Sequence, residues 1–519
     1  MAVAHLAPGA PDPALMASAL RDFLSTHEGV HVSEAGLPVA RLDSASGYAL
    51  DCASGHLVFH LWSADANFVR RVLRAAPRDS QRMDLDCWRM GHPRPTRVVL
   101  DARSPLLASP AQPRAQARED FQSQLLAAIT RAWPGWHLDR AATGPAELRT
   151  SGGASGLLRL LFRRQHQTLA WLALEAGEPA GAYDALLAQG LAWIELLRAR
   201  NSNSPLKSVH LVLPEAARRV LAGRSRWLRS HPPLACFRFD ASSGELEATP
   251  LEDDGNCSTV LRRAPARASE PQSPASAELL AHVRSRCPDA AWEIGPSGAG
   301  RVLVFGLEVA REALPGELLA PHYFGIGREA SPLVPAAQPL LDRLLDQVAR
   351  ERVPGRDARA PLYALQPERW MEHLLRADPS RLDPSLASGA IQSQISLGTG
   401  RILDLLALDR DGRLVVIELK AGEDLGFPLQ ALDYWRWVRH HQHLGDFERL
   451  GYFPGRGISP LPPRLWLVAP ALRWHPHTDL VARWFSCQGD NAVPLTCLGL
   501  NETWRAGFQV LFRKHLSAA

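Results

Sequence analysis

The stretch RILDLLALDRDGRLVVIELK, residues 401–420, decides the fold of the C-terminal part of this chain. Two aliphatic runs, residues 402–408 and 414–419, flank a short polar segment that ends in Gly412. A short loop that ends in glycine predicts a β-hairpin, with the glycine in the left-handed backbone region. The runs on either side therefore predict two antiparallel strands.

Two carboxylates and an ammonium group are predicted to converge on one face of this hairpin. If residues 410–412 form the loop, counting outward in pairs places Asp404 directly opposite Glu418. Because side chains alternate across a strand, Lys420 shares the face of Glu418. Burying such charges among Val, Ile and Leu costs several kcal/mol unless they are paired or hold a metal. The spacing therefore predicts a functional site, and a structural salt bridge between Lys420 and Asp404 is the alternative.

Asp404 followed by Glu418-Leu419-Lys420 resembles the D…(D/E)xK signature of the PD-(D/E)XK nuclease superfamily, which has the restriction-endonuclease-like fold. The hairpin is most similar to the C-terminal nuclease domain of the archaeal and mycobacterial mismatch endonucleases. The resemblance covers about residues 367–468. One departure is Leu403, which stands before Asp404 where that branch usually has Ile.

The residue types suit metal-assisted hydrolysis of a phosphodiester. Asp404 and Glu418 are hard oxygen ligands for Mg²⁺ or Mn²⁺, and the carbonyl group of Leu419 is a further candidate ligand. Lys420 can orient the attacking water and stabilise the charge of the transition state.

The resemblance implies further site residues on two helices. In the superfamily, a Glu on the helix before the sheet often contacts the metal or its water. Glu368 fits by position, Glu372 stays open, and a solvated helix face is the alternative. Gln430 begins a QALDYW pattern resembling the helix whose Gln faces the active site, although a core amide is the other interpretation. We expect nucleic-acid contacts from Arg401, Gln394, Tyr434, Arg436 and Arg439.

An upstream segment repeats the hairpin pattern without its charges. Residues 156–178 align without a gap on residues 401–423, and two later pieces match in the same order. Such order predicts an internal duplication, with chance similarity of two amphipathic hairpins as the alternative. Each site position changes in the gapless alignment: Arg159 stands for Asp404, Ala173 for Glu418 and Glu175 for Lys420. The upstream copy is therefore expected to hold no metal and to pair Arg159 with Glu175.

Length and composition indicate a globular protein of several domains. The chain has 519 residues, 46% of them hydrophobic and 22% charged, with a net charge of +4 that permits contact with nucleic acid. Its 7 cysteines are scattered without a CxxC pair, which argues against a disulfide framework or a zinc ribbon. We find no signal-peptide pattern and no bilayer-spanning run, so we expect a cytoplasmic protein without a membrane partner. Homo-oligomerisation stays open.

We expect an α/β (α+β) protein with a C-terminal mixed sheet flanked by helices. The expected parts are a small α+β domain at 1–110, a degenerate nuclease-like domain at 115–262, a linker at 263–277, a middle α+β segment at 278–356 and the nuclease domain at 357–519. In the first part, a helix capped by Ser63 is predicted, with a cluster of arginines as either a phosphate contact or a solvated face: Arg70, Arg71, Arg74, Arg78 and Arg82.

The sequence thus predicts a metal-dependent nuclease, with DNA the favoured substrate. The alternative from another class is a non-cleaving nucleic-acid-binding or scaffold protein built on nuclease-like folds. A metal site for a different hydrolysis is the third interpretation.

Overall fold

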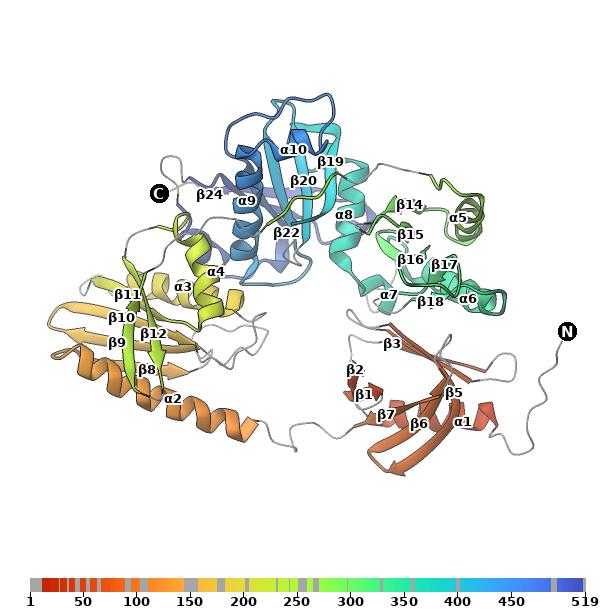
Figure 1. Ribbon diagram of the computed structural model, residues 1–519, viewed down its shortest axis with the longest axis horizontal. Helices are drawn as coiled ribbons and strands as arrows, with labels where there is room; N and C mark the ends of the chain where they lie inside the picture. Colours follow the sequence, from red (N-terminus) through yellow and green to blue (C-terminus); the bar gives the residue numbers. More distant parts are fainter. Residues whose placement is uncertain are drawn as a thin grey trace. The chain divides into compact units, whose positions relative to one another are not determined.

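The structure, a computed structural model, describes residues 12–27, 29–34, 37–42, 47–52, 57–62, 67–88, 95–102, 111–143, 157–174, 183–200, 205–229, 232–241, 243–250, 259–264, 270–295, 297–326, 330–355, 360–397, 402–486 and 492–516. The chain forms two compact units (Figure 1). The first combines Met1–Ser109 with Pro265–Leu374, and the second combines Pro110–Ala264 with Leu375–Ala519. Mixed sheets flanked by helices make up the second unit, as the α/β prediction requires.

The first unit begins with an antiparallel sheet in the order β2-β1-β7-β6-β5-β4-β3. Helix α1, Pro13–Thr26, is capped by Asp12, whose carboxylate accepts a hydrogen bond from the Ala14 N–H at 2.9 Å. Its buried face, including Leu20, joins the core of this sheet. The strands are β1 Val30–Glu34, β2 Leu37–Leu42, β3 Gly47–Asp51, β4 Leu57–Trp62, β5 Asn67–Asp79, β6 Arg82–Trp88 and β7 Thr96–Asp101.

The helix predicted after Ser63 is wrong: this segment is strand β5, and Ser63 itself lies outside the described residues. Phe68, Arg70 and Val72 are buried at every second position, which is the period of a strand. Arg70 therefore faces the core rather than a solvated helix face. Its guanidinium donates to both carboxylate oxygens of Glu34, at 2.8 and 2.6 Å.

A second antiparallel sheet, β14-β15-β16-β17-β18, completes the first unit. Helices α5, Pro274–Arg286, and α6, Gln338–Glu351, pack on it in one core. Helix α5 starts inside the segment expected to be a linker, because Ser273 caps it by accepting the Ser276 N–H at 3.1 Å. The strands are β14 Ala290–Ile294, β15 Gly300–Val304, β16 Leu307–Glu312, β17 His322–Phe324 and β18 Ser331–Pro332.

Two further helices follow, α7 at Pro361–Ala364 and α8 at Pro367–Ala377. The boundary between the units falls inside α8 at Leu374, later than the start at residue 357 expected from the sequence. The beginning of α8 belongs to the first unit because the Trp370 ring stacks on Phe305, with centroids 5.0 Å apart. None of the helices within the described part of the chain is long and apolar enough to cross a membrane.

The second unit consists of two six-stranded sheets with the same topology. We call Pro110–Ala264 the upstream half and Leu375–Ala519 the downstream half. In each sheet the first three strands pair antiparallel, the third, fourth and fifth pair in parallel, and the sixth returns antiparallel. The upstream strands are β8 His137–Thr143, β9 Leu157–Arg164, β10 Gln167–Leu174, β11 Leu206–Val212, β12 Leu234–Asp240 and β13 Glu245–Thr249. The downstream strands are β19 Leu386–Ser396, β20 Ile402–Asp409, β21 Leu414–Leu419, β22 Arg464–Pro470, β23 Leu495–Leu500 and β24 Val510–Leu516.

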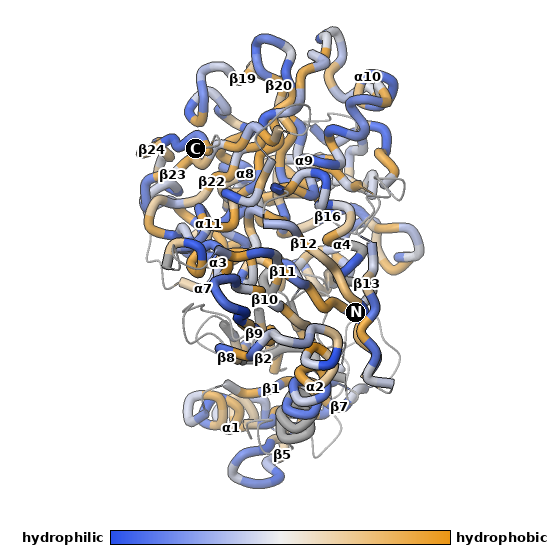
Figure 2. Tube along the Cα trace, turned by 90° about the vertical axis from the view of Figure 1, so that its left-hand side faces the viewer, coloured by the Kyte–Doolittle hydropathy of each residue, from blue (hydrophilic) through white to orange (hydrophobic). Residues whose placement is uncertain are grey.

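The helices of the two halves also follow one order. A long helix links the third strand to the parallel fourth strand in each, and a shorter one links the fourth to the fifth. Figure 1 shows α2 on one face of the upstream sheet and α3 with α4 on the other. The buried strands form hydrophobic stretches that are orange in Figure 2 around β22 and β23. The helices are α2 Ala111–Ala132, α3 Tyr183–Arg200, α4 Glu215–Ser225, α9 Phe427–His443, α10 Asp446–Arg449 and α11 Thr478–Ala482.

A local two-fold relationship connects the halves. Leu228, after α4, forms an antiparallel bridge with Phe485, after α11. The Arg229 N–H donates to the Trp484 carbonyl at 2.7 Å, and the Ser486 N–H donates to the Trp227 carbonyl at the same distance. Residues at matching places therefore contact each other reciprocally, as across a two-fold axis. One continuous hydrophobic core, including α3 and α9, spans both halves.

Candidate active site

The hairpin of β20 and β21 has the predicted register. Leu405 pairs with Ile417, which places Asp404 opposite Glu418 one step further out. Gly412 has φ +77°, and a Cβ at this position would lie 2.7 Å from the Gly457 carbonyl oxygen. The loop therefore requires glycine both for its backbone angles and for this close approach.

Polar side chains form a row across three neighbouring strands. Ser393 pairs with Leu405 and Ile395 with Leu403, so Gln394 on β19 lies opposite Asp404 on β20. Gln394 is buried and has φ +55°, an irregularity in the strand where the row begins. The row thus runs from this amide through the two carboxylates.

Burial and mutual repulsion control the charge of the two carboxylates. Glu418 is 2% exposed, and its pKa is raised well above the ordinary range by burial and then by the charge of Asp404. Lys420 acts in the opposite direction and favours the ionised form of Glu418. The half-buried Asp404 accepts a hydrogen bond from the Leu419 N–H at 3.0 Å. Lys420 forms an ion pair with Asp424, 3.6 Å away, rather than lying free in solvent.

The donor set fits a hard divalent cation. Glu418 Oε2 is buried and has no hydrogen-bond partner among the described residues, which leaves a carboxylate oxygen available as a ligand. No group of three or more His, Cys, Asp or Glu side chains in the described ranges is arranged to hold a metal. Two carboxylates are nevertheless what Mg²⁺ uses when water and substrate phosphate supply its other ligands. Asp404, Glu418 and the Leu419 carbonyl would hold it.

Helix α9 packs against β21 and β22 and carries most of the other predicted residues. The side-chain amide of Gln430 donates to the Tyr434 hydroxyl at 3.3 Å. Tyr434, from which a nucleic-acid contact was expected, is 3% exposed, so its ring face is not open for stacking on a base. Arg436 donates to the Gly223 carbonyl of the upstream half, and Arg439 donates to the Pro460 carbonyl at 3.1 Å. These guanidinium groups make internal contacts that no local feature of the sequence indicates.

The remaining predicted residues lie elsewhere. Glu368 is half-buried in the first turn of α8, and its neighbour Glu372 is buried and forms an ion pair with Arg369 at 3.2 Å. Both belong to the first unit, whereas Asp404 and Glu418 belong to the second. Arg401 lies outside the described residues.

The upstream half presents different residues at the matching positions. Its hairpin closes with the two-residue turn after Arg164, which pairs with Gln167, and the turn is one residue shorter than the downstream loop. The register consequently shifts, and Leu172 lies opposite Arg159. Pairing with the next strand agrees, since Leu172 pairs with Leu211 as Glu418 pairs with Leu467.

The gapless alignment was therefore wrong by one residue in the second strand. The counterparts of Glu418 and Lys420 are Leu172 and Leu174, not Ala173 and Glu175, and Glu175 lies outside the described residues. Arg159 keeps its place opposite the counterpart of Glu418 and is 4% exposed. A carboxylate is absent from all three described counterparts.

Sequence reasoning missed an ion pair that joins the two halves. Arg224, at the end of α4, donates to both carboxylate oxygens of Asp433 on α9, at 2.9 and 2.7 Å, and also to Asp184 at 2.7 Å. Its side chain is 0% exposed. Next to it, the rings of Trp227 and Trp435 meet edge to face at 4.9 Å.

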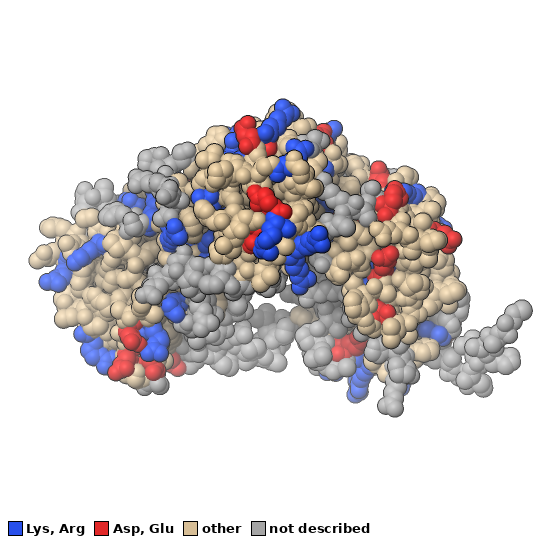
Figure 3. All heavy atoms as spheres, turned by 45° about the horizontal axis from the view of Figure 1, so that its top comes forward, with Lys and Arg blue, Asp and Glu red and all other residues tan. Residues whose placement is uncertain are grey.

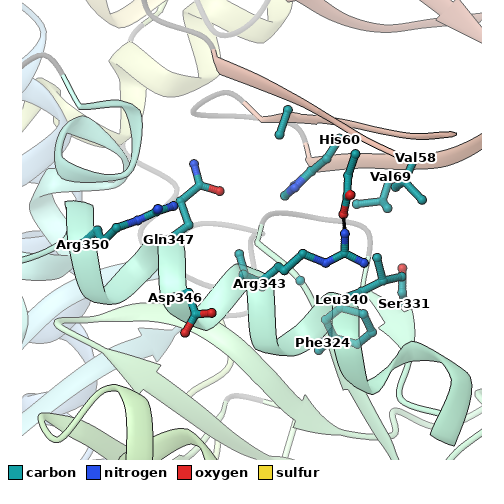
Figure 4. Close-up of a pocket in the computed structure, with 14 residues that line it drawn as sticks. Val58, His60, Val69, Phe324, Ser331, Leu340, Arg343, Asp346, Gln347 and Arg350 are labelled. Carbon is teal, nitrogen blue, oxygen red and sulfur yellow. Dashed lines mark ion pairs between the residues drawn. The ribbon is translucent and has the colours of Figure 1, made fainter. Parts of the chain in front are cut away.

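A pocket of about 320 Å³ in the first unit lies beside α6, with His60 and Gln347 in its wall and an ion pair between Asp51 and Arg343 (Figure 4). It brings no set of metal ligands together in the described residues. The face drawn in Figure 3 shows basic and acidic side chains interspersed rather than one continuous basic surface.

Comparison with known proteins does not add to this geometry. No protein-family model matches the chain, and no curated protein matches it. The assignment of a function therefore depends on the site itself.

Proposed function

We propose that the protein is a metal-dependent nuclease that hydrolyses phosphodiester bonds of nucleic acid, with DNA the favoured substrate. One observation carries the proposal: the buried Glu418 lies opposite Asp404 and keeps one carboxylate oxygen without a partner in the described residues. Two acidic groups that repel each other inside a sheet are unfavourable unless a cation offsets their charge. The resemblance to the PD-(D/E)XK signature supports the same assignment.

The chain's residues have distinct parts in this mechanism. Asp404 and Glu418 would hold Mg²⁺ or Mn²⁺, which would supply stabilisation of the negative charge that develops on the phosphate. Burial and Asp404 raise the pKa of Glu418, and Lys420 only partly offsets them. A bound cation would therefore be needed to favour the ionised carboxylate. The ammonium group also donates hydrogen bonds that orient the attacking water and stabilise the transition state. Burial of the β20–β21 strands on both faces keeps these groups in place.

A non-cleaving role is favoured for the upstream half alone. Its counterparts of Asp404 and Glu418 are Arg159 and Leu172, and neither provides an oxygen ligand. This half shares a core with the downstream half and therefore supports it structurally.

The proposal is tested with labelled single- and double-stranded DNA and RNA, incubated with Mg²⁺, Mn²⁺ or EDTA. Cleavage is expected with either metal and not in EDTA, and it should be lost in Asp404→Ala, Glu418→Ala and Lys420→Ala. Asp411→Asn is the matched control, because this carboxylate lies exposed in the loop of the same hairpin. Full activity in any of the three site variants would contradict the assignment.

A further inference from the structure

The second unit contains two halves related by a local two-fold, and among its described residues the carboxylate pair Asp404 and Glu418 has no counterpart at the matching positions of the other half. The reciprocal hydrogen bonds of Trp227 and Trp484 place equivalent backbone segments across from each other. Their tryptophan side chains repeat the relationship, since Trp227 packs on Trp435 of α9 and Trp484 donates to the Leu191 carbonyl of α3 at 3.2 Å. The arrangement is that of a dimer built within one chain.

The strands of a duplex have the same kind of symmetry. Two-fold axes relate the antiparallel backbones of double-stranded DNA, and two-fold dimers use matching elements on both strands. A symmetric pair of active halves would thus present one catalytic centre to each strand. Here one centre has Asp404 and Glu418, and the matching place in the other half has Arg159 and Leu172.

A second copy of the chain cannot use the same face to supply the missing centre. Helix α9 of the downstream half is already covered by the upstream half through Asp433, Trp435 and Arg436. The buried ion pair from Arg224 to Asp433 fixes this cover. The interface that would pair two active halves is therefore occupied within one molecule.

We propose that the protein cuts only one strand of a duplex in each binding event and releases a nicked product. This inference rests on the proposed nuclease activity. In the reaction, the oxygen of water forms a bond to phosphorus and the bond from phosphorus to one bridging sugar oxygen breaks. The proton of the water goes to that leaving oxygen. One phosphate ester is hydrolysed, and the opposite strand stays intact because Arg159 and Leu172 supply no ligand for a second metal.

Supercoiled plasmid tests the proposal directly, because one nick gives an open circle and two opposed cuts give a linear molecule. With Mg²⁺ and full-length protein, supercoiled plasmid should be lost to open circle, and linear plasmid should stay minor until the supercoiled form is consumed. Asp411→Asn should give the same products, and Glu418→Gln should leave the plasmid supercoiled.

The outcomes separate this inference from the nuclease assignment. Linear plasmid formed from the start, or a rate that rises with the square of the protein concentration, would show that a second centre acts and would overturn the inference. Cleavage restricted to single-stranded substrates would also overturn it. In all three cases the nuclease assignment stands. No cleavage of any nucleic acid would instead overturn the proposed function itself.

Discussion

Removing one partner of the buried ion pair between Arg224 and Asp433 should strongly destabilise the second unit. We consider Arg224→Met, which keeps the length of the side chain but removes its charge. Asp433 would then stay buried, since its side chain is 4% exposed in the intact pair. Breaking a buried pair by removing one partner typically costs about 3–5 kcal/mol.

The structure allows an independent bound on this cost. An unpaired buried carboxylate can always become neutral by taking up a proton. The ordinary pKa of Asp lies roughly 3 units below pH 7, and protonation costs about 1.36 kcal/mol for each unit, so the upper limit is about 4 kcal/mol. We therefore expect Arg224→Met to lower the free energy of unfolding by about 3–4 kcal/mol at pH 7. Protonation becomes easier as the pH falls, so the difference from the wild type should shrink to about 1.5 kcal/mol near pH 5.

Urea denaturation followed by tryptophan fluorescence measures this difference. Arg198→Met is the matched control, because its pair with Glu195 has an arginine that is 37% exposed, and such pairs contribute only about 0.2–1 kcal/mol. Arg224→Met/Asp433→Leu should be more stable than Arg224→Met alone, since no carboxylate is stranded at that position. A loss below about 1 kcal/mol in Arg224→Met, independent of pH, would refute the reasoning.

Two further predictions concern charge at the site and backbone fit in the first unit. Because the pKa of Glu418 is raised in the native state, the folded protein keeps the proton of the Glu418 carboxyl group to a higher pH than the unfolded chain does. The free energy of unfolding of the metal-free protein should therefore fall as the pH rises above about 4.5. In EDTA at pH 8, Glu418→Gln should therefore melt at a higher temperature than the wild type, and the difference should vanish near pH 4. An equal or lower melting temperature of the variant at pH 8 would contradict this prediction. Gly306→Ala should lower the free energy of unfolding, measured by denaturant titration, more than Gly298→Ala does. Both glycines have a positive φ, which costs a substituted residue about 1–2 kcal/mol. Of these two positions, Gly306 is the one where a Cβ would meet a carbonyl oxygen, that of Arg369 at 2.1 Å. Equal losses in the two variants would count against this contact.

The sequence predicted the hairpin and its register because both depend on local features. A glycine-ended loop and alternating side chains are enough to place Asp404 opposite Glu418. The upstream hairpin was misaligned for an equally local reason, since a gapless comparison cannot detect a turn that is one residue shorter. Strand β5 was mistaken for a helix because the spacing of Phe68 and Val72 fits both periods, and only pairing with β4 and β6 decides between them.

What the sequence could not predict depends on contacts between distant segments. Arg224 and Asp433 are 209 positions apart, and nothing near either residue indicates the other. The same contact surface includes Arg436, whose guanidinium donates to the Gly223 carbonyl. Helix α9 reads as an exposed basic helix until the upstream half is known to cover it.

Calorimetric titration with Mn²⁺ tests the central claim most directly, because it asks whether Asp404 and Glu418 form a metal site. The account predicts that the wild-type protein binds Mn²⁺ and that binding is lost in Asp404→Ala/Glu418→Ala, while Asp411→Asn binds like the wild type. Binding that persists in the double variant would place the metal elsewhere, with the neighbouring His475 and His477 as the first residues to examine. Absence of binding in the wild type would contradict the account outright.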